Sequence, residues 1–277
     1  MNYFETLNTT VKNALTEDIQ TGDLTAGLIP AENQATATII CREAAIVCGR
    51  PWFDETIHQV DPAIEIHWNV EEGQKVEADQ LLCTLKGSAR NILTAERTAL
   101  NFLQTLSATA TVTANYMKKL AGSNTKLLDT RKTLPNLRMA QKYAVKCGGG
   151  TNHRIGLYDA ILIKENHIMA AGGINNAVST AKSLHPDITV EVETENLNEV
   201  QQAVDAGADI IMLDNFTIED MYKAVELVDG KAKLEVSGNV EIDHLADLAK
   251  TGVDFISTGA ITKHIQAIDL SMRFVNH

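Results

Sequence analysis

The N-terminal part of the chain alternates between short apolar stretches and polar turns. The spacing of its apolar positions predicts, in order, a helix at 2–16, two strands within 34–49, a short helix at 54–60 and a hairpin-like unit with Gly73 at its bend. Helices and strands mixed in this way indicate an α+β region.

Two further segments have a regular spacing of apolar residues, one after the hairpin-like unit and one at the C-terminal end of the chain. Apolar side chains within 88–120 are spaced for one buried face, which predicts a single long helix. Arg90 and Arg97 share a face of that helix, where pairing with an acidic residue such as Glu96 is the simplest role for them. At the other end of the chain, residues 268–274 alternate between apolar and polar, which predicts a half-buried strand that returns to the N-terminal sheet.

From Lys126 onward, short apolar runs alternate with amphipathic helical segments. Such βα units predict a parallel sheet or barrel. Six strand candidates are fewer than the eight of a complete (βα)8 barrel, so either the barrel is incomplete or further strands escape the pattern. The candidates end near Thr130, Lys164, Glu193, Asp214, Ser237 and Gly259.

Positive charge is concentrated where the first two of these strands end. The 277-residue chain has a net charge of −12, yet eight Lys or Arg and two acids lie within 126–164. The side chains that follow strands or lie in a glycine-rich return are Arg131, Lys132, His153, Arg154 and Lys164. Because the carboxyl ends of parallel strands meet at one edge of a sheet, these side chains can converge on one pocket for an anion.

Between these strand ends lies a helix with three further cations. Pro135 at its start and the glycines 148–150 at its end delimit the helix. Arg138, Lys142 and Lys146 are spaced four apart on one face. We expect that face to be a solvated basic surface rather than part of the pocket.

Composition narrows the function classes. A hydrophobic content of 44% supports a real core, no apolar run approaches the length of a membrane span, and the N-terminus shows no signal pattern, so we expect a cytoplasmic protein without a membrane partner. An isoelectric point near 5.1 argues against nucleic acid as a partner. The four cysteines lack the spacing of a metal site, so reduced thiols are expected.

The later strand ends carry carboxylates and small-residue loops. A pair such as Glu193 and Asp214 can hold Mg²⁺, bind ribose hydroxyls, act as acid and base or stabilise a cationic transition state, and charge balance for the nearby lysines is the simplest alternative. The loops SGN at 237–239 and STGA at 257–260 suit a phosphate, because glycine lets backbone N–H groups approach its oxygens. A phosphosugar with a second, anionic substrate would fill all three zones.

Several stretches resemble one enzyme family along nearly the whole chain. They are ERTALN at 96–101, DTRKTLPNLRMAQKYAVKCGGGTNHRIGLYDAILIKENH at 129–167, EVET at 191–194, IMLDN at 211–215, SGN at 237–239 and STGAIT at 257–262. They are similar to the quinolinate phosphoribosyltransferase family, also called nicotinate-nucleotide pyrophosphorylase (carboxylating). The resemblance implies conversion of quinolinate and phosphoribosyl pyrophosphate, with Mg²⁺ as cofactor, to nicotinate mononucleotide, pyrophosphate and CO₂ in de novo NAD biosynthesis.

The same resemblance implies a fold and an assembly. Residues 109–264 would form an open, incomplete α/β barrel of six to seven parallel strands. Residues 1–108, completed by 265–277, would form an N-terminal α/β sandwich domain. Family members form homodimers, in which Arg97 would reach across the interface into the partner's site. The sequence leaves open whether dimers assemble further into a hexamer.

The resemblance also implies a role for each matching residue. The quinolinate carboxylates would be bound by Arg97, Arg131, His153 and Arg154. The catalytic positions would be Lys132, Lys164, Glu193 and Asp214, of which the two carboxylates would also hold Mg²⁺ directly or indirectly. The phosphoribosyl and phosphate contacts would be Thr130, Ser237, Gly238, Asn239, Gly259, Ala260 and Ile261.

Two classes of alternative remain. Related phosphoribosyltransferases that act on another base, such as nicotinate-preferring enzymes or homologues linked to molybdenum transport operons, would share the phosphate loops, but the TRK and NHR motifs favour a substrate with two carboxylates. A biotinyl or lipoyl carrier would explain VEEGQKVEADQLLCTLKG at 70–87, yet the required Met-Lys-Met or Asp-Lys-Ala triplet is absent. A phosphometabolite-binding module would not explain the cationic cluster.

Overall fold

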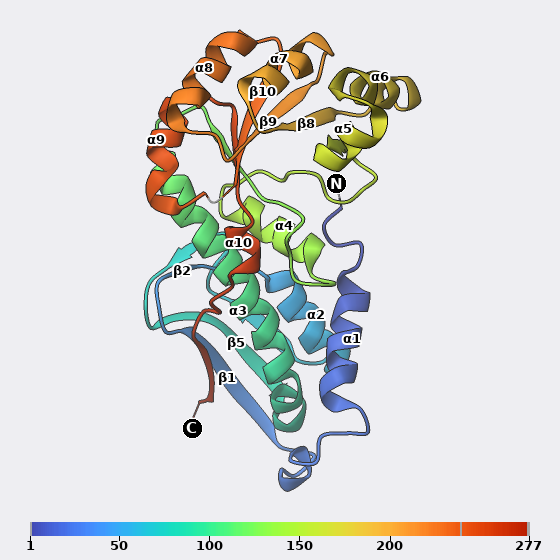
Figure 1. Cartoon of the computed structure of the whole chain (residues 1–277). Helices are drawn as coiled ribbons and strands as arrows, with labels where there is room; N and C mark the ends of the chain where they lie inside the picture. Colours follow the sequence, from blue (N-terminus) through green and yellow to red (C-terminus); the bar gives the residue numbers. More distant parts are fainter. Residues whose placement is uncertain (1, 239, 276–277) are drawn as a thin grey trace. The chain divides into compact units, whose positions relative to one another are not determined.

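The chain folds into two compact units that interleave along the sequence (Figure 1). The structure is a computed structural model that describes residues 2–238 and 240–275. Unit 1 comprises Met1–Ala114, Thr133–Gly149 and Ile261–His277, and unit 2 comprises Asn115–Lys132 and Gly150–Ala260. The domain boundary expected between residues 108 and 109 stays a prediction, because each unit consists of several separate segments of the chain.

Unit 1 is built on a four-stranded antiparallel sheet with strand order β12-β1-β5-β3. Strand β1 (Gln34–Cys41) pairs with both β5 (Gln80–Ser88) and β12 (Leu270–Phe274), and β3 (Glu65–Trp68) lies at the other edge. A separate pair consists of β2 (Ala45–Ile46) and β4 (Lys75–Val76). The prediction that the last segment returns to the N-terminal sheet is therefore confirmed.

The long helix α3 (Ala89–Lys119) lies along this sheet (Figure 1). Its buried residues Ile92 and Leu103 belong to the same hydrophobic core as Ile39 of β1 and Leu85 of β5. The helical period that predicted one buried face is thus explained by the sheet that covers it. Burial of these side chains stabilises the unit by roughly 1.5–3 kcal/mol for each fully buried aliphatic residue.

Two shorter helices complete the N-terminal part of unit 1, and the first begins later than predicted. They are α1 (Leu7–Ile19) and α2 (Arg50–Val60), with a short 3₁₀ turn η1 (Ala26–Leu28) between them. The residues before α1 form turns, and the ring of Phe4 packs against Trp52 and Tyr143, with ring centroids 5.6 Å and 5.1 Å away. Anchoring of this aromatic side chain explains why the helix does not start at residue 2.

Helix α4 (Arg138–Cys147) appears where the sequence placed it, but its predicted basic face is not uniformly solvated. Lys146 is exposed as expected, whereas Lys142 is fully buried, so the expectation for Lys142 was wrong. The adjacent Gln141 is also buried, and its side-chain amide donates to the carbonyl oxygen of Thr262 at 2.8 Å. A four-residue spacing puts cations on one side of a helix but does not fix what covers that side.

Unit 2 is an open α/β barrel of six parallel strands in the order β6-β11-β10-β9-β8-β7. The strands are β6 (Lys126–Leu128), β7 (Ile161–Ile163), β8 (Val190–Thr194), β9 (Ile210–Asp214), β10 (Lys233–Ser237) and β11 (Phe255–Ser257). Each matches a strand candidate of the sequence, which confirms the incomplete barrel. Strands β6 and β7 are the two edges of the sheet, and beside β6 a single parallel bridge joins Leu128 to Thr151.

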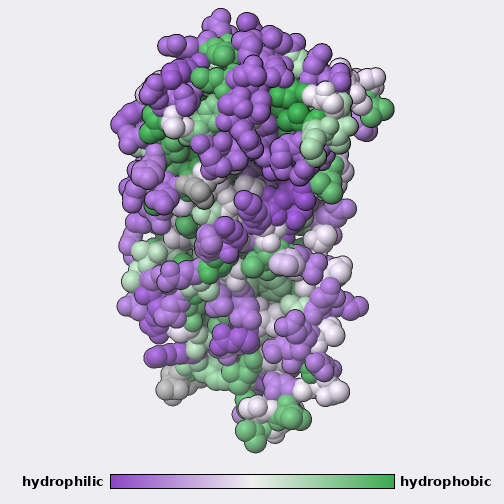
Figure 2. Space-filling view, in the orientation of Figure 1, coloured by the Kyte–Doolittle hydropathy of each residue, from purple (hydrophilic) through white to green (hydrophobic). Residues whose placement is uncertain are grey.

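Helices connect the strands of unit 2, and α6, α7 and α8 lie outside β8, β9 and β10 (Figure 1). The helices are α5 (Glu165–Ala171), α6 (Ile174–Leu184), α7 (Leu197–Asp205), α8 (Ile218–Val228) and α9 (Leu245–Lys250), with the turn η2 (Ile242–His244) and the short α10 (Ala260–Lys263) near the end. Side chains over α7 and α8 are mostly hydrophilic on the face shown in Figure 2. None of the helices in the described part of the chain is long and apolar enough to cross a membrane.

Capping side chains fix where two of these helices begin. Asn196 accepts a hydrogen bond from the N–H of Glu199 at the start of α7, and Thr217 accepts one from Asp220 at the start of α8. Such caps satisfy backbone donors that the helix itself leaves unpaired. The helices therefore start shortly after β8 and β9 end, and the connecting loops are short. Loops of this length leave the carboxyl ends of the two strands accessible to a ligand.

Candidate active site

The carboxyl ends of the unit 2 strands surround a cavity of about 210 Å³. Its lining residues are Thr130, Arg131, Lys132, His153, Arg154, Leu162, Lys164, Glu193, Met212, Glu235, Ser237 and Ser257. The basic side chains predicted at strand ends and in the glycine-rich return of unit 2 are all among them. This convergence is what parallel topology requires of residues that follow neighbouring strands.

The other predicted site residues of unit 2 lie at adjoining strand ends. Asp214 is the last residue of β9, and Gly238 follows β10. Gly259 and Ala260 lie just after β11. Asn239 lies outside the described residues. Arg97 and Ile261 belong to unit 1, where Arg97 is exposed on α3 and Ile261 is buried in α10.

Two glycines allow the loops to approach the strand ends closely. A Cβ at Gly259 would lie 2.9 Å from Cδ of Lys132 and 3.2 Å from Oγ1 of Thr130, so this glycine lets the loop after β11 touch the segment after β6. Gly238 has φ +89, and a Cβ there would overlap the side-chain oxygen of Asn215 and lie 3.0 Å from Oδ1 of Asp214. Both positions therefore need glycine for a physical reason, namely close packing and, at Gly238, a left-handed backbone.

A carboxylate faces a lysine inside the cavity. Nζ of Lys164 lies 2.6 Å from Oε2 of Glu193, and the two side chains are 44% and 14% exposed. The main-chain N–H of Lys164 donates to Nδ1 of His167 at 3.0 Å, which orients the turn into α5. Because Lys164 is half exposed, this ion pair adds little to the stability of the fold. Its effect is to hold a positive and a negative charge side by side in the cavity.

Two aspartates hold the loop that presents His153 and Arg154. The buried carboxylate of Asp129 accepts the N–H of His153 at 2.9 Å and the side-chain amide of Asn152 at 2.6 Å. Further on, Asp159 accepts the N–H groups of Ile155 and Gly156 at 2.7 Å and 2.9 Å. The loop is thus tied on both sides of Arg154, which fixes a guanidinium at the cavity wall.

The cations stand close enough to repel one another. Burial, and after it the charge of Arg131, lowers the pKa of Arg154 from its ordinary value. A guanidinium keeps its charge in proteins even so. Two fixed, mutually repelling guanidinium groups form an environment that a planar dianion would stabilise, since each can donate two parallel hydrogen bonds to a carboxylate.

His153 faces two buried carboxylates. Its Nε2 lies 2.9 Å from Oε2 of Glu191 and 3.3 Å from Oε2 of Glu235. Burial opposes the charged form of the ring, but the contacts with Glu191 and Glu235 outweigh it and raise the pKa of His153 to about 10. Burial raises the pKa of the Glu191 carboxyl group, and the hydrogen bond with His153 acts against this effect. On the other side of the ring, the main-chain N–H of Arg154 donates a hydrogen bond to Nδ1 at 2.7 Å.

Known proteins with this architecture share both sequence and fold with the chain. The family profile "Quinolinate phosphoribosyl transferase, N-terminal domain" matches residues 18–107, and "Quinolinate phosphoribosyl transferase, C-terminal domain" matches residues 109–273. The chain belongs to the quinolinate phosphoribosyltransferase family.

Individual relatives agree with this assignment. The chain is 40% identical to a probable nicotinate-nucleotide pyrophosphorylase [carboxylating] from Synechocystis sp., over 95% of this chain and 90% of the relative. A solved structure of the nicotinate-nucleotide pyrophosphorylase from Francisella tularensis has a TM-score of 0.96 and 54% identity, covering 99% of this chain and 98% of the other. Human nicotinic acid phosphoribosyltransferase, at 15% identity and a TM-score of 0.65 over 97% of this chain and 74% of that one, shares the fold alone.

Sequence reasoning missed part of the cavity of this phosphoribosyltransferase. Glu235 and Met212 line it without having been assigned to it. For Glu235 a signal was present in the sequence, because this glutamate interrupts the apolar run of β10. A charged residue in the middle of a buried parallel strand points into the barrel, where it requires a partner.

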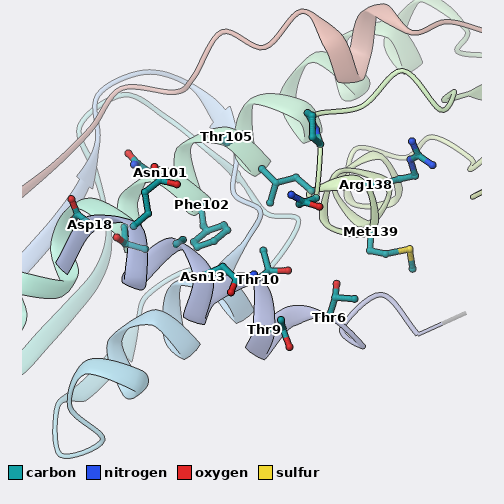
Figure 3. Close-up of a pocket in the computed structure, with 16 residues that line it drawn as sticks. Thr6, Thr9, Thr10, Asn13, Asp18, Asn101, Phe102, Thr105, Arg138 and Met139 are labelled. Atoms are coloured by element: carbon teal, nitrogen blue, oxygen red, sulfur yellow. The ribbon is translucent and has the colours of Figure 1, made fainter. Parts of the chain in front are cut away.

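A larger cavity, of about 640 Å³, lies within unit 1 (Figure 3). It is lined by residues of α1 and α3 and by the segment that leads into α4, including Asn13, Phe102 and Met139. Among its described lining residues Arg138 is the single cation, and Asp18 is one of two acids. The charge of its lining therefore suits an anionic ligand less well than the lining of the smaller cavity of unit 2, in spite of the difference in volume.

Proposed function

We propose that this enzyme transfers the phosphoribosyl group of phosphoribosyl pyrophosphate to quinolinate and decarboxylates the product, giving nicotinate mononucleotide, pyrophosphate and CO₂ in NAD biosynthesis. The observation that carries the proposal is the convergence of Arg131, His153 and Arg154 on one cavity, in a chain that belongs to this family. Quinolinate has two adjacent carboxylates, and these three side chains supply more positive charge than nicotinate, with one carboxylate, would require.

The site supports a division of the cavity between the two substrates. Arg131, His153 and Arg154 bind the carboxylates of quinolinate through charge-assisted hydrogen bonds. Lys132 and Lys164 neutralise the pyrophosphate as it leaves. Thr130, the loop after β10 and the loop after β11 hold the 5′-phosphate through hydroxyl and backbone N–H donors.

The chemistry follows from these charges. The lone pair of the pyridine nitrogen attacks the anomeric carbon while the bond from that carbon to pyrophosphate breaks and its electron pair leaves with pyrophosphate. Glu193 and Asp214 stabilise the positive charge that develops on the ribose ring. The ribosylated ring is then a pyridinium, so the bond to the carboxylate beside the nitrogen can break with release of CO₂. Its electron pair stays on the ring carbon next to the positive nitrogen and takes up a proton.

Mg²⁺ is the proposed cofactor, and the carboxylates at the ends of β8 and β9 suit it. Glu193 and Asp214 offer the hard oxygen donors that Mg²⁺ prefers, at the edge of the cavity where a diphosphate would lie. Bound there, the cation would neutralise charge on the leaving pyrophosphate. Lys164, which contacts Glu193, would then share that task from the protein side.

The proposed assembly is a homodimer in which Arg97 completes the partner's quinolinate site. The cytoplasmic location expected from the sequence stays a prediction. Support for a role in trans is that the side chain of Arg97 is exposed on α3, where its charge acts on the adjacent Glu96 but makes no side-chain hydrogen bond or ion pair with another described residue. The test is complementation: Arg97→Ala and Lys164→Ala subunits, each inactive alone, should regain partial activity when mixed. No recovery in verified heterodimers would count against a shared site.

The reaction itself is tested with quinolinate labelled in the carboxylate beside the nitrogen. Release of labelled CO₂ is expected only when phosphoribosyl pyrophosphate and Mg²⁺ are both present, with nicotinate mononucleotide as the second product. No release from folded protein would move the substrate to another base, and nicotinate would be tested next by the same product analysis without the label.

A further inference from the structure

Two of the four cysteines meet in unit 1, although they lie far apart in the sequence. The sulfur atoms of Cys48 and Cys147 and a carboxylate oxygen of Glu72 all lie within 4.8 Å of one another. Cys48 directly precedes Gly49, the N-cap residue of α2, and Cys147 is the last residue of α4. The proposed phosphoribosyl transfer uses none of these side chains. Two thiols this close together are the arrangement in which one cysteine is oxidised and the other closes a disulfide.

The two thiols differ in their access to solvent. Cys147 is partly exposed, whereas the other three cysteines of the chain, all of which the structure describes, are buried. Reactive cysteines are accessible to solvent, and structural buried ones are inert. A small oxidant dissolved in water therefore meets Cys147 first, and Cys48 reacts only with a group that Cys147 carries.

Hydrogen bonds stabilise the thiolate form of Cys147. The thiol of Cys48, and to a smaller extent the hydroxyl of Tyr143, lowers the pKa of Cys147 by bonding to its sulfur, against the opposing effects of burial and of the charge of Glu72. Burial raises the pKa of the Cys48 thiol, and the bond with Cys147 adds to this effect. Because the thiolate is the nucleophile, Cys147 is the residue that attacks an oxidant and Cys48 is the one that keeps its proton.

The main chain holds the carboxylate and the buried thiol in place. Oε1 of Glu72 accepts the N–H of Gly49 at 2.7 Å, and Oε2 accepts that of Arg50 at 3.1 Å. The N–H of Cys48 donates to Oγ of Ser107 at 2.9 Å, and the hydroxyl of Ser107 donates to the carbonyl oxygen of Cys48 at 3.1 Å. Glu72 also accepts a hydrogen bond from the Cys48 thiol. A carboxylate in this position can take the proton of the thiol as Cys48 reacts.

We propose that Cys147 and Cys48 form a redox-active pair whose substrate is a hydroperoxide, with Glu72 as the base of the second step. In the first step, the thiolate sulfur of Cys147 attacks one oxygen of hydrogen peroxide and the O–O bond breaks. Cys147 becomes a sulfenic acid, and the hydroxide that leaves takes a proton from the solvent to give water.

The second step closes the disulfide. The sulfur of Cys48 attacks the sulfur of Cys147, the S–O bond of the sulfenic acid breaks, and Glu72 takes the proton of the Cys48 thiol. The hydroxide that leaves receives that proton and becomes water. Each sulfur has then lost one electron, the peroxide has taken up both, and a dithiol reductant reverses the bond by thiol–disulfide exchange.

The test treats the reduced protein with hydrogen peroxide, blocks the remaining thiols under denaturing conditions and identifies the peptides by mass spectrometry. The peptides that contain Cys48 and Cys147 should be joined by a disulfide that dithiothreitol reverses. Cys41 and Cys83 are internal controls and should be alkylated in full, because both are buried. The matched control variant is Cys83→Ser, which removes a buried thiol of the same unit and should leave the cross-link unchanged.

Substitutions around the pair separate the two steps. Cys48→Ser should stop at the sulfenic acid of Cys147, which dimedone traps, with complete loss of the cross-linked peptides. Glu72→Gln should slow disulfide closure roughly a hundredfold, as removal of a positioned base does. It should not slow formation of the sulfenic acid, because the charge of Glu72 opposes the thiolate. A merely structural role of Glu72 would not separate the two rates. Tyr143→Phe, which should slow the first step alone, serves if Glu72→Gln does not fold.

Three outcomes would overturn the inference. One is full alkylation of Cys48 and Cys147 after peroxide treatment of the folded wild-type protein. Another is a cross-link that joins Cys147 to Cys41 or Cys83 as often as to Cys48, since proximity would then not decide the product. The third is one equivalent of zinc in the purified protein that is lost in Cys48→Ser, because the cluster would then be a metal site. None of these measurements involves quinolinate, so their failure would leave the proposed function untouched.

Discussion

Replacement of Gly238 by alanine should weaken the binding of phosphoribosyl pyrophosphate and spare that of quinolinate. Gly238 follows β10 with φ +89, and its added Cβ would meet the side chain of Asn215 and lie 3.0 Å from Oδ1 of Asp214. The amide of Asn215 donates to Oδ2 of Asp214 at 3.0 Å. A methyl group at this position therefore displaces the Asp214–Asn215 pair as a unit, and Asp214 is the carboxylate proposed to stabilise the charge on the ribose ring.

The magnitude separates into a backbone part and a contact part. A left-handed backbone costs an alanine roughly 1–2 kcal/mol relative to glycine. Alanine also has less conformational freedom than glycine in the unfolded chain, which favours the folded state by about 0.4–1 kcal/mol. The net loss of stability from the backbone is therefore about 1 kcal/mol. Displacement of Asp214 by a few tenths of an ångström removes one well-placed hydrogen-bond acceptor, which corresponds to about tenfold in affinity, or ~1.4 kcal/mol.

The control for the backbone part is Gly207→Ala. Gly207 belongs to the same unit and also has a left-handed backbone, with φ +77, but nothing lies within 4 Å of the added Cβ. Urea unfolding should show a loss of stability for both variants, at least as large for Gly238→Ala because its Cβ also meets Asn215, while calorimetry should show weaker binding of phosphoribosyl pyrophosphate only for Gly238→Ala. Equal affinity for phosphoribosyl pyrophosphate in the two folded variants would refute the assignment of this loop and of Asp214 to that substrate.

Two further predictions concern the cationic side of the cavity. Arg131→Ala should lose roughly 2–5 kcal/mol of binding free energy for quinolinate, the cost of truncating a buried charge-assisted pair, with phosphoribosyl pyrophosphate still bound; unchanged quinolinate affinity by calorimetry would remove Arg131 from the site. The pKa of His153 is 6.5 in the unfolded chain and about 10 in the folded protein, so its protonation stabilises the fold fully below pH 6.5 and progressively less as the pH rises to about 10. Urea unfolding between these two pH values should therefore show a shallower loss of stability for His153→Gln than for the wild type, and parallel curves would mean that the ring is not held as an imidazolium.

The sequence predicted the barrel well because its physical signal is local. A parallel strand covered on both faces favours a continuous apolar run, as in β7 and β9, and the runs of β8 and β10 remain recognisable although a glutamate interrupts each of them. The cations were predicted for a topological reason, since they follow such runs. The place of Glu235 in the cavity was not predicted because its partner, His153, is far away in the sequence. The burial of Lys142 was not predicted because it depends on tertiary packing around α4. Arg97 was assigned by family resemblance alone, since an exposed arginine on a helix carries no local signal of function.

The missing side of the barrel also has a consequence for how such a site could arise or be redesigned. Beside the edge strand β6, the chain makes one bridge, at Thr151, and then leaves the strand direction to present His153 and Arg154. In a closed barrel that stretch would continue as a paired strand, and its alternate side chains would point away from the interior. An insertion that completed the ladder would make the scaffold more regular and would abolish the anion pocket. The gap in the sheet therefore leaves room for His153 and Arg154 at the cavity, and substitutions along 151–159 would change the charge of the cavity without altering a strand.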